Sequence, residues 1–276
     1  MMLPPLLLVG GGAMGSAMLS GWVEAGVSQV VVIDPAPTRA LTGPAVTVVP
    51  DAASVPAGFD PACVILAVKP QMAGAVLPGL ARFGGVALSI MAGRTIAGLS
   101  AVLTGPVVRA MPNTPAAIRA GITVACAGPG VSPAQRALCD ALLRAVGVVE
   151  WVDEEGMIDA VTAVSGGGPA YVFLLAELLE QAAIEEGLPA PLARRLARVT
   201  VAGSGALLAA SDADAAVLRR QVTSPAGTTE RALAVLMADA AWPALIPRAI
   251  AAATARSREL AATVSSFENK GSLSGQ

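Results

Sequence analysis

Short, continuous apolar runs alternate with helical patterns over the first 110 residues of the chain. Runs without polar interruptions are typical of parallel strands that are covered on both faces. We expect strands at Leu6–Val9, Val30–Ile33, Val46–Val49, Cys63–Ala67, Val86–Ser89 and Val107–Arg109. Helices are expected between them, at Ala13–Ala25, Gln71–Ala81 and Ile96–Leu103. This alternation predicts a doubly wound α/β sheet.

The pattern changes near Asp153. Two further runs, Ile122–Ala127 and Val148–Val152, flank a helix near Pro133–Ala145 and are expected to extend the sheet. Strand patterns then end, and long Ala/Leu-rich segments follow: Gly156–Val164, Ala170–Glu186, Pro191–Ala210, Ala213–Gln221, Thr228–Asp239 and Trp242–Ala262. We therefore expect a sheet domain over residues 1–152, an all-α domain over 153–264 and a disordered, Ser/Gly-rich tail over 265–276. Helices this rich in alanine are expected to complete their burial in a homo-oligomer.

A glycine motif follows the first predicted strand directly and opens the first predicted helix. Gly10, Gly12 and Gly15 form G-x-G-x-x-G. In this context the first glycine permits a tight turn, the second lets the backbone approach a pyrophosphate, and the third lets the helix pack on the strand. The helix start at Ala13 and Met14 then presents free N–H groups to the phosphates. The motif predicts a Rossmann-type dinucleotide site, and a glycine-rich turn without a ligand is the alternative.

Asp34 ends the second predicted strand, about 20 residues after the last glycine of the motif. An acidic side chain there accepts from both ribose hydroxyls, which favours NAD and repels a 2′-phosphate. Thr38 and Arg39 follow closely and are suited to receive such a phosphate. Asp34 can also be read as an Asp-Pro turn residue. The choice between NADH and NADPH stays open.

Composition excludes several classes of protein. Apolar residues make up 54% of the chain and the mean hydropathy is +0.67, but the charge-free window Ala160–Ala176 contains Gly166–Pro169, which is expected to break a membrane-spanning helix. No basic residue precedes Arg39, so we expect no signal peptide and a cytoplasmic location. The net charge of −2 without a basic stripe argues against nucleic-acid binding.

The chain contains no histidine and three cysteines. Without histidine, the commonest metal ligand and the commonest general acid–base are missing, so we expect neither a metal site nor Ser-His-Asp hydrolysis. The cysteines show no C-x-x-C spacing and are interpreted as buried, reduced thiols.

Five further segments, in order, resemble one family. They are Ala67–Gln71 (A-V-K-P-Q), Ser89–Gly93 (S-I-M-A-G), Arg109–Pro115 (R-A-M-P-N-T-P), Asp159–Tyr171 (D-A-V-T-A-V-S-G-G-G-P-A-Y) and Ser224–Thr229 (S-P-A-G-T-T). Together with the glycine motif they are similar to the pyrroline-5-carboxylate reductase family, from the first strand to about Leu260. The combination is far more specific than any one segment.

The resemblance implies an enzyme that reduces the cyclic imine 1-pyrroline-5-carboxylate to L-proline with NADPH or NADH, the last step of proline biosynthesis. It implies an N-terminal Rossmann-type domain and an all-α C-terminal dimerisation domain. It also implies a homodimer, which can gather into a larger ring, and a Thr228-Thr229 loop that completes the site beside the partner's cofactor.

The resemblance and the strand ends together select site residues. Those expected to bind the cofactor are Gly10, Gly12, Ala13, Met14, Gly15, Asp34, Ala67, Val68, Lys69, Pro70, Ala92, Gly93 and Asn113. Those expected to bind the substrate are Ser165, Gly166, Gly168, Pro169, Ser224 and Gly227, with Thr228 and Thr229 in the catalytic role. The alternatives are a surface charge for Lys69, a turn residue for Asn113, a helix-entry loop for Ser165–Pro169 and a ligand-free helix cap for Ser224–Thr229.

Two positions depart from the family pattern. Gly167 stands where the family usually has Ser, so one hydroxyl is lost at the start of a helix. Ala226 stands where the family usually has Gly, and an alanine is strained if that position needs a positive φ. Both departures bear on substrate geometry more than on the class of reaction.

The missing histidine agrees with imine reduction. A ketone needs an acid for the developing alkoxide, whereas a cyclic imine can arrive already protonated and needs mainly positioning. A 3-hydroxyacid-type dehydrogenase is the alternative enzyme, but it requires a lysine in the helical domain and the two lysines are Lys69 and Lys270. A non-catalytic nucleotide-sensing Rossmann protein is the third reading, and it has no need for the Ser224–Thr229 loop.

Overall fold

The computed structural model describes residues 2–37 and 41–271, with side chains as far as residue 262. Its contacts separate two units. The sheet unit comprises the chain up to Gly166 and from Ala253 onward, and the helical unit comprises Gly167–Ala252. The division therefore lies at Gly166 and not after residue 152, because the segment that follows the last strand packs on the sheet: Ile158 is fully buried in its core.

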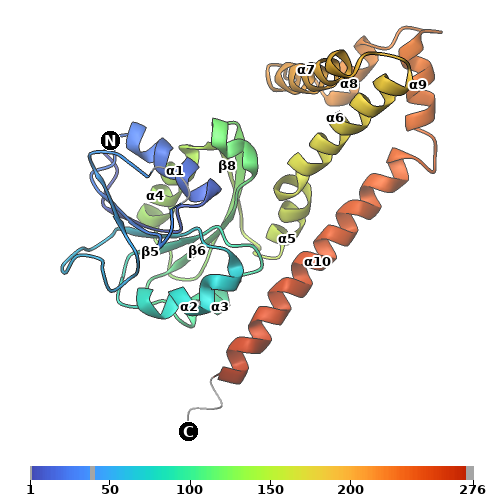
Figure 1. Cartoon of the computed structure of the whole chain (residues 1–276). Coiled ribbons are helices and arrows are strands. Elements are labelled where there is room, and N and C mark those ends of the chain that lie inside the picture. The colour runs from blue at the N-terminus through green and yellow to red at the C-terminus, as the bar shows by residue number, and fades with distance from the viewer. Residues whose placement is uncertain (1, 38–40, 272–276) are drawn as a thin grey trace. The chain divides into compact units, whose positions relative to one another are not determined.

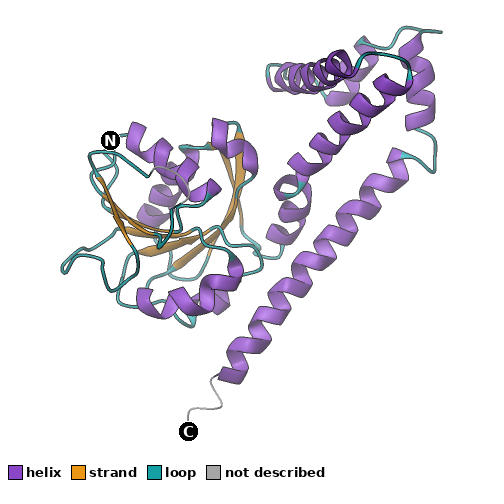
Figure 2. Cartoon of the chain, in the orientation of Figure 1, coloured by secondary structure: helices purple, strands orange, loops and turns teal. Residues whose placement is uncertain are grey.

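The sheet unit is built on an eight-stranded sheet in the described residues, with the strand order β3-β2-β1-β4-β5-β6-β7-β8 (Figures 1 and 2). The strands are β1 Leu6–Val9, β2 Val30–Ile33, β3 Val46–Val49, β4 Cys63–Leu66, β5 Val86–Ser89, β6 Val107–Met111, β7 Gly121–Ala127 and β8 Gly147–Val152. All neighbouring strands pair in parallel except β6 and β7, which are antiparallel. The predicted Rossmann-type architecture is confirmed, and the two later apolar runs do extend the sheet.

Successive side chains along each strand point to opposite faces of the sheet and so contribute to two apolar layers, one on each face. Leu6 and Leu8 belong to the layer under α1 (Ala13–Glu24) and α4 (Pro133–Arg144). Leu7 and Val9 belong to the layer under α2 (Ala73–Val76), α3 (Ile96–Ser100) and α5 (Met157–Val161). Because both faces of the sheet are covered, the central strands β1, β2 and β4 are apolar and buried throughout, which is why their sequence runs are continuous.

The segment after β4 is less regular than expected. Instead of one helix over Gln71–Ala81, it forms a 3-10 turn η1 (Pro70–Met72), the single turn α2 and a second 3-10 turn η2 (Leu77–Leu80). Pro78 has no N–H to donate and its ring crowds the preceding turn, which disfavours a continuous α-helix through this segment. The prediction of one regular helix is wrong for this reason.

The helical unit contains the expected helices. They are α6 Gly168–Glu185, α7 Ala190–Ala209, α8 Ala215–Gln221, α9 Thr228–Leu236 and the first turns of α10 Trp242–Gly271. Helix α10 runs on to Gly271, through residues 265–271 that were expected in a disordered tail. After Pro247, no glycine or proline interrupts the sequence until Gly271, so the helix can propagate that far; residues 272–276 lie outside the described part.

One stretch, Met157–Glu185, is long and apolar enough to cross a membrane by length and composition alone, with a mean hydropathy of 1.3 in its most apolar window. It is not one regular α-helix. After α5 the backbone forms a π-helical segment η4 (Thr162–Gly166), bends at Gly167 and starts α6 at Gly168, with Pro169 in the first turn. The glycines therefore interrupt the helix, as expected, but helical structure resumes directly after them.

We predict that Gly147→Ala destabilises the sheet unit by about 2–4 kcal/mol, from left-handed strain and overpacking together. Gly147 has φ +147° at the start of β8, and an added Cβ would overlap the carbonyl oxygen of Gly121 on β7. Chemical denaturation followed by circular dichroism measures the change. Gly84→Ala is the matched control, because no atom lies within 4 Å of the Cβ position there; equal stability of the two variants would contradict the prediction.

Candidate functional site

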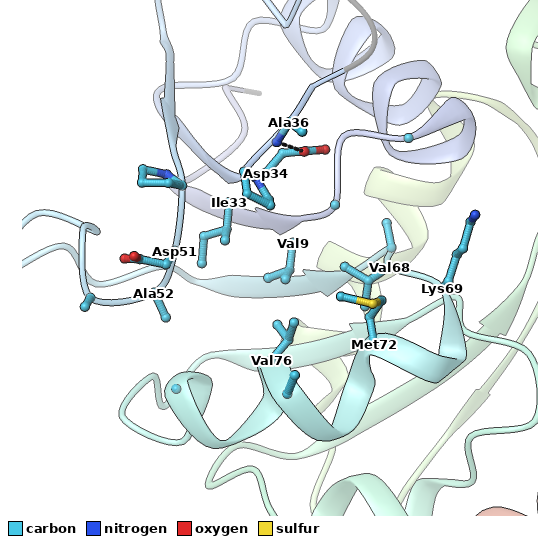
Figure 3. A pocket seen from close by; sticks show the side chains of 18 residues that line it. Val9, Ile33, Asp34, Ala36, Asp51, Ala52, Val68, Lys69, Met72 and Val76 are labelled. Atoms are coloured by element: carbon cyan, nitrogen blue, oxygen red, sulfur yellow. Dashed lines mark hydrogen bonds between the residues drawn. The ribbon is translucent and has the colours of Figure 1, made fainter.

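A pocket of about 750 Å³ opens at the carboxyl ends of β1, β2, β3 and β4, where doubly wound sheets bind their ligands. Six of the predicted cofactor residues line it: Gly10, Gly12, Asp34, Ala67, Val68 and Lys69. Its apolar wall comes from Val9, Ile33, Ala52, Met72 and Val76 (Figure 3). An apolar wall with a few polar groups at its rim suits a flat base with a ribose and phosphates attached.

The glycine loop has the geometry that a pyrophosphate requires. Gly10 has φ +100°, so the turn is one that glycine adopts without strain. A Cβ at Gly15 would overlap the carbonyl oxygen of Gly10, whereas a Cβ at Gly12 would meet no described atom within 4 Å. The turn and packing roles expected of Gly10 and Gly15 are confirmed, and the space in front of Gly12 is open.

Helix α1 begins directly at this open space. Its N-cap is Gly12, and no side chain caps it among the described residues. The N–H groups of Ala13 and Met14 have no partner inside the helix, as in any first turn, and the positive end of the helix dipole lies there. The residues present therefore fit a dinucleotide whose pyrophosphate lies on the start of α1.

Asp34 is held by the backbone on both of its carboxylate oxygens. Oδ2 accepts the Gly11 N–H at 2.8 Å, which ties the glycine loop to the end of β2, and Oδ1 accepts the Ala36 N–H at 3.0 Å. The second bond is the Asx turn that an Asp-Pro sequence predicts. Asp34 is thus a turn residue and a pocket residue at once, and its role toward the ribose stays a prediction.

A second carboxylate, that of Asp51, lies beyond the end of β3 on the same side of the pocket as Asp34 (Figure 3). The Ser54 hydroxyl donates to Asp51 Oδ1 at 2.8 Å, and this bond, with that from the Ser54 N–H, lowers the pKa of the Asp51 carboxyl. Two acidic side chains, those of Asp34 and Asp51, therefore line the same pocket. The predicted phosphate ligands Thr38 and Arg39 lie outside the described residues.

Lys69 lies on the opposite side of the pocket from Asp34 (Figure 3). It belongs to the segment that follows β4 and also carries Ala67 and Val68. Its backbone caps η1, and the Pro70 carbonyl oxygen accepts from Arg94 Nη2 at 2.9 Å. This contact fixes the A-V-K-P-Q turn against the loop after β5. A cation at this position suits a phosphate or a carboxylate, and its role in binding stays a prediction.

The remaining predicted cofactor residues do not line the pocket. Asn113 Oδ1 accepts the Ile122 N–H at 3.0 Å and so braces the loop between β6 and β7. Gly93 has φ +69°, and a Cβ there would lie 3.2 Å from Leu260 Cβ of α10. The loop of Ala92 and Gly93 therefore packs closely under α10, and the positive φ together with this contact accounts for the glycine. A role for these residues in cofactor binding stays a prediction.

A buried charge holds the segment that carries Ser165. Arg109 of β6 is 2% exposed; its Nη1 lies 3.0 Å from Glu155 Oε1, and its Nη2 lies 3.6 Å from Asp159 Oδ1. Both carboxylates belong to the stretch that forms α5 and leads into η4. Sequence reasoning noted Arg109 only as part of a motif, although a lone arginine within an apolar strand is itself a sign of a buried ion pair.

The end of β6 also touches this segment. A Cβ at Gly166 would meet Met111 Cγ and Sδ at 3.7 Å, so the π-helical turn lies over the carboxyl end of the strand. Within that turn the Ser165 hydroxyl donates to the Val161 carbonyl oxygen at 3.2 Å. π-helical turns are frequent at functional sites. Ser165 and Gly166 are thus placed at the sheet edge at which ligands bind, in the same unit as the pocket.

The other predicted substrate residues belong to the helical unit. Gly168 and Pro169 form the first turn of α6, and Ser224–Thr229 forms the loop that enters α9. Gly227 is the N-cap of α9, with no side-chain cap in the described chain, so the N–H groups of Thr228 and Thr229 have no intrahelical partner. Both threonines are exposed. This loop has the free donors that a carboxylate needs.

Sequence reasoning missed the pocket residues that follow β3 and those of the turn after β4, such as Asp51, Met72 and Val76. Asp51 follows a parallel strand at its carboxyl end, so the rule that ligands bind there was a sufficient reason to include it. Met72 and Val76 carry no local pattern that points to a ligand. They line the pocket from η1 and α2, the short turns that follow β4.

The cysteines lie inside the sheet unit. Cys63, Cys126 and Cys139 are free and buried, as predicted. Burial raises the pKa of the Cys63 thiol well above its ordinary value and also raises that of Cys126, so neither forms a ready thiolate. Within the described residues, no three cysteine, aspartate or glutamate side chains gather as a metal site would require.

Comparison with known proteins agrees with this geometry. A family model described as pyrroline-5-carboxylate reductase dimerisation matches residues 155–260, and one described as NADP oxidoreductase, coenzyme F420-dependent, matches residues 6–93. The pyrroline-5-carboxylate reductase of Pseudomonas aeruginosa is 42% identical over 268 residues, which cover 94% of this chain and 97% of that protein. That of Mycobacterium tuberculosis strain H37Rv is 38% identical over 290 residues, with coverage of 94% and 97%.

Solved structures give the same result. The pyrroline-5-carboxylate reductase from Coxiella burnetii superposes with a TM-score of 0.82 at 32% identity, covering 92% of this chain and 97% of that one. The pyrroline carboxylate reductase from Plasmodium falciparum, with NADP bound, superposes with a TM-score of 0.80 at 26% identity, covering 93% and 98%. Since these matches run through the glycine loop, the sheet and the helical unit alike, the chain belongs to the pyrroline-5-carboxylate reductase family.

Proposed function

We propose that this protein reduces 1-pyrroline-5-carboxylate to L-proline with NADPH or NADH, as the last step of proline biosynthesis in the cytoplasm. The observation that carries the proposal is the full-length likeness to reductases of that name, 42% identical over 94% of the chain in one case. The pocket at the glycine loop and the free amides of the Ser224–Thr229 loop support it, because the reaction needs a site for the cofactor and a site for the substrate carboxylate.

The cofactor's adenosine part is assigned to the apolar wall of the pocket, and its ribose to Asp34. Its pyrophosphate is assigned to Gly12 and the N–H groups of Ala13 and Met14 at the start of α1. Lys69, on the far side of the pocket from Asp34, meets the next anionic group along the cofactor or the substrate. NADPH or NADH supplies the hydride when bound, and the protein supplies binding and orientation.

The substrate carboxylate is assigned to the Thr228 and Thr229 N–H groups, and the Thr229 hydroxyl to the ring nitrogen or the carboxylate. A cyclic imine that enters protonated needs no strong acid from the protein. The work of the site is to hold the imine carbon in place and to exclude water, which can supply several kcal/mol of the barrier reduction. This assignment accounts for a reductase without histidine.

The protein is proposed to act as a homodimer, and these dimers are proposed to gather into larger rings. In the helical unit, large apolar side chains are exposed along α6 and α7, among them Phe173, Leu174, Leu178, Leu196, Val199 and Leu207. Exposed apolar surface of this extent marks an interface. The family model that covers these helices describes dimerisation. In such a dimer, the Thr228-Thr229 loop of one subunit is expected to complete the site beside its partner's cofactor.

We predict that the protein oxidises NADPH or NADH only when 1-pyrroline-5-carboxylate is present, and that Gly12→Val raises the KM for the cofactor at least tenfold. The branched side chain fills the open space in front of the first turn of α1. Steady-state kinetics, followed by nicotinamide absorbance, measures both effects. Gly84→Val is the control, since that position is equally open but lies outside the pocket. An inactive wild-type protein would refute the function, and an unchanged KM would refute the placement of the pyrophosphate.

We predict that Asp34→Ser shifts the kcat/KM ratio of NADPH to NADH toward NADPH by on the order of tenfold or more, because it removes a negative charge beside the ribose. Asp34→Asn is the matched variant. It removes the same charge while keeping an oxygen that can accept the Gly11 N–H. If only the serine variant moves the ratio, the cause is loss of support for the glycine loop; an unmoved ratio in both makes Asp34 a turn residue alone.

We predict that Thr229→Ala and Thr229→Val both lower kcat/KM for the imine by on the order of ten- to a hundredfold, which is the effect of losing one hydrogen bond to a charged group. Valine keeps the shape and deletes the hydroxyl, so the two variants should agree. Fluorescence titration should find cofactor affinity unchanged in both. Full activity of Thr229→Val would exclude a role for the hydroxyl, and a loss of many more decades would make Thr229 an essential proton donor.

A further inference from the structure

Ala226 has a backbone conformation that alanine rarely adopts. Its φ is +58°, in the left-handed region, and Arg119 is the other non-glycine residue with a positive φ in the described chain. The Cβ of an L-residue crowds the following carbonyl oxygen in this region, and only glycine enters it freely. Alanine stays there only if the surrounding structure holds it. Ala226 lies in the Ser224–Thr229 loop, three residues before Thr229.

Two hydrogen bonds hold the loop closed. The Ala226 N–H donates to Glu230 Oε2 at 2.8 Å, and the Gly227 N–H donates to the Ser224 carbonyl oxygen at 3.0 Å. Glu230 occupies the first turn of α9, where a carboxylate is favoured by the helix dipole. Its reach back to the residue before the N-cap resembles a capping box displaced by one residue. The Glu230 carboxylate thus bonds directly to the residue with the strained backbone.

This arrangement decides which amides of the loop remain free. The Ala226 and Gly227 N–H groups are both engaged inside the loop. The next two, of Thr228 and Thr229, start α9 and have no intrahelical partner. If Ala226 left the left-handed region, the peptide plane before Gly227 would rotate and the start of α9 would change direction. The free amides and the Thr229 hydroxyl would then move from their present positions.

The Glu230 contact lies on an exposed part of the helical unit. Ala226 and Glu230 are both exposed, and neither belongs to an apolar core among the described residues. Loss of an exposed hydrogen bond costs little stability, whereas the backbone that it holds belongs to the loop assigned to the substrate. The bond therefore acts on the position of the loop and not on the stability of the unit.

We infer that Glu230 is a positioning residue: by accepting the Ala226 N–H, its carboxylate holds Ala226 in the left-handed conformation that presents the Thr228 and Thr229 amides to the substrate carboxylate. This inference rests on the proposed function of the loop. A glycine at position 226 would adopt the left-handed conformation without support. With alanine there, the Glu230 side chain of α9 supplies that support. Glu230 and Ala226 then form a functional pair, in which the residue at 226 decides how much the loop depends on Glu230.

Four variants test the pair: Glu230→Ala, Glu230→Gln, Ala226→Gly and the double variant Ala226→Gly/Glu230→Ala. Glu230→Ala should raise the KM for 1-pyrroline-5-carboxylate about tenfold, with kcat and the KM for the cofactor changed less than about threefold. Glu230→Gln keeps an acceptor oxygen and should stay near the wild type. Adding Ala226→Gly to Glu230→Ala should restore most of the lost affinity, because glycine enters the left-handed region without support.

Hydrogen–deuterium exchange of the peptide that spans the loop gives a readout that does not need the reaction. Exchange should speed up in Glu230→Ala and return toward the wild-type rate in Glu230→Gln, while thermal midpoints stay unchanged. Glu185→Ala, which removes an exposed carboxylate from the end of α6, is the matched control for charge. Wild-type turnover with an unchanged KM in Glu230→Ala, or no rescue by Ala226→Gly, overturns the inference. A wild-type protein that fails to reduce the imine overturns the proposed function instead. In that case, an unchanged exchange rate of the loop peptide in Glu230→Ala still overturns the role of Glu230.

Discussion

The buried guanidinium of Arg109 is the constraint on which the organisation of the sheet unit depends. A charge that is 2% exposed within an apolar strand is costly unless it is paired, and its Nε and Nη2 find no hydrogen-bond partner in the described chain. The carboxylates of Glu155 and Asp159 lie 3.0 and 3.6 Å away and compensate it. The stretch that carries them must therefore dock on β6, although its sequence reads as the beginning of the helical half.

The same two carboxylates accept hydrogen bonds from further helices of the sheet unit. Glu155 Oε1 also accepts the Ile96 N–H at the start of α3, at 2.8 Å, and Asp159 Oδ1 accepts the Ser257 hydroxyl of α10 at 2.7 Å. One buried cluster thus joins a strand and three helices of the sheet unit. The π-helical segment with Ser165 follows α5 immediately, so the charge pair also sets where a predicted substrate residue lies.

The two units carry different kinds of candidate binding surface. In the sheet unit the pocket is formed within one chain, and the close approach of α1 to the carbonyl oxygen of Gly10 depends on Gly15 having no side chain. In the helical unit the amides of Thr228 and Thr229 are presented on an exposed loop, whose shape depends on one strained alanine. The apolar side chains exposed on α6 and α7 explain why such a unit is suited to work in a dimer.

The sequence by itself determined what depends on local geometry: the strands, most helices and the Gly10–Gly15 loop follow from apolar periodicity and from the absence of a Cβ. Tertiary structure alone decided which distant residues meet. It moved the unit boundary to Gly166, placed Leu260 over Gly93 and brought Asp51 to the pocket that Asp34 also lines. Contacts between residues far apart in the chain leave no periodic pattern in the sequence. The local backbone preferences of each residue are the same whether or not its distant partner is in contact with it.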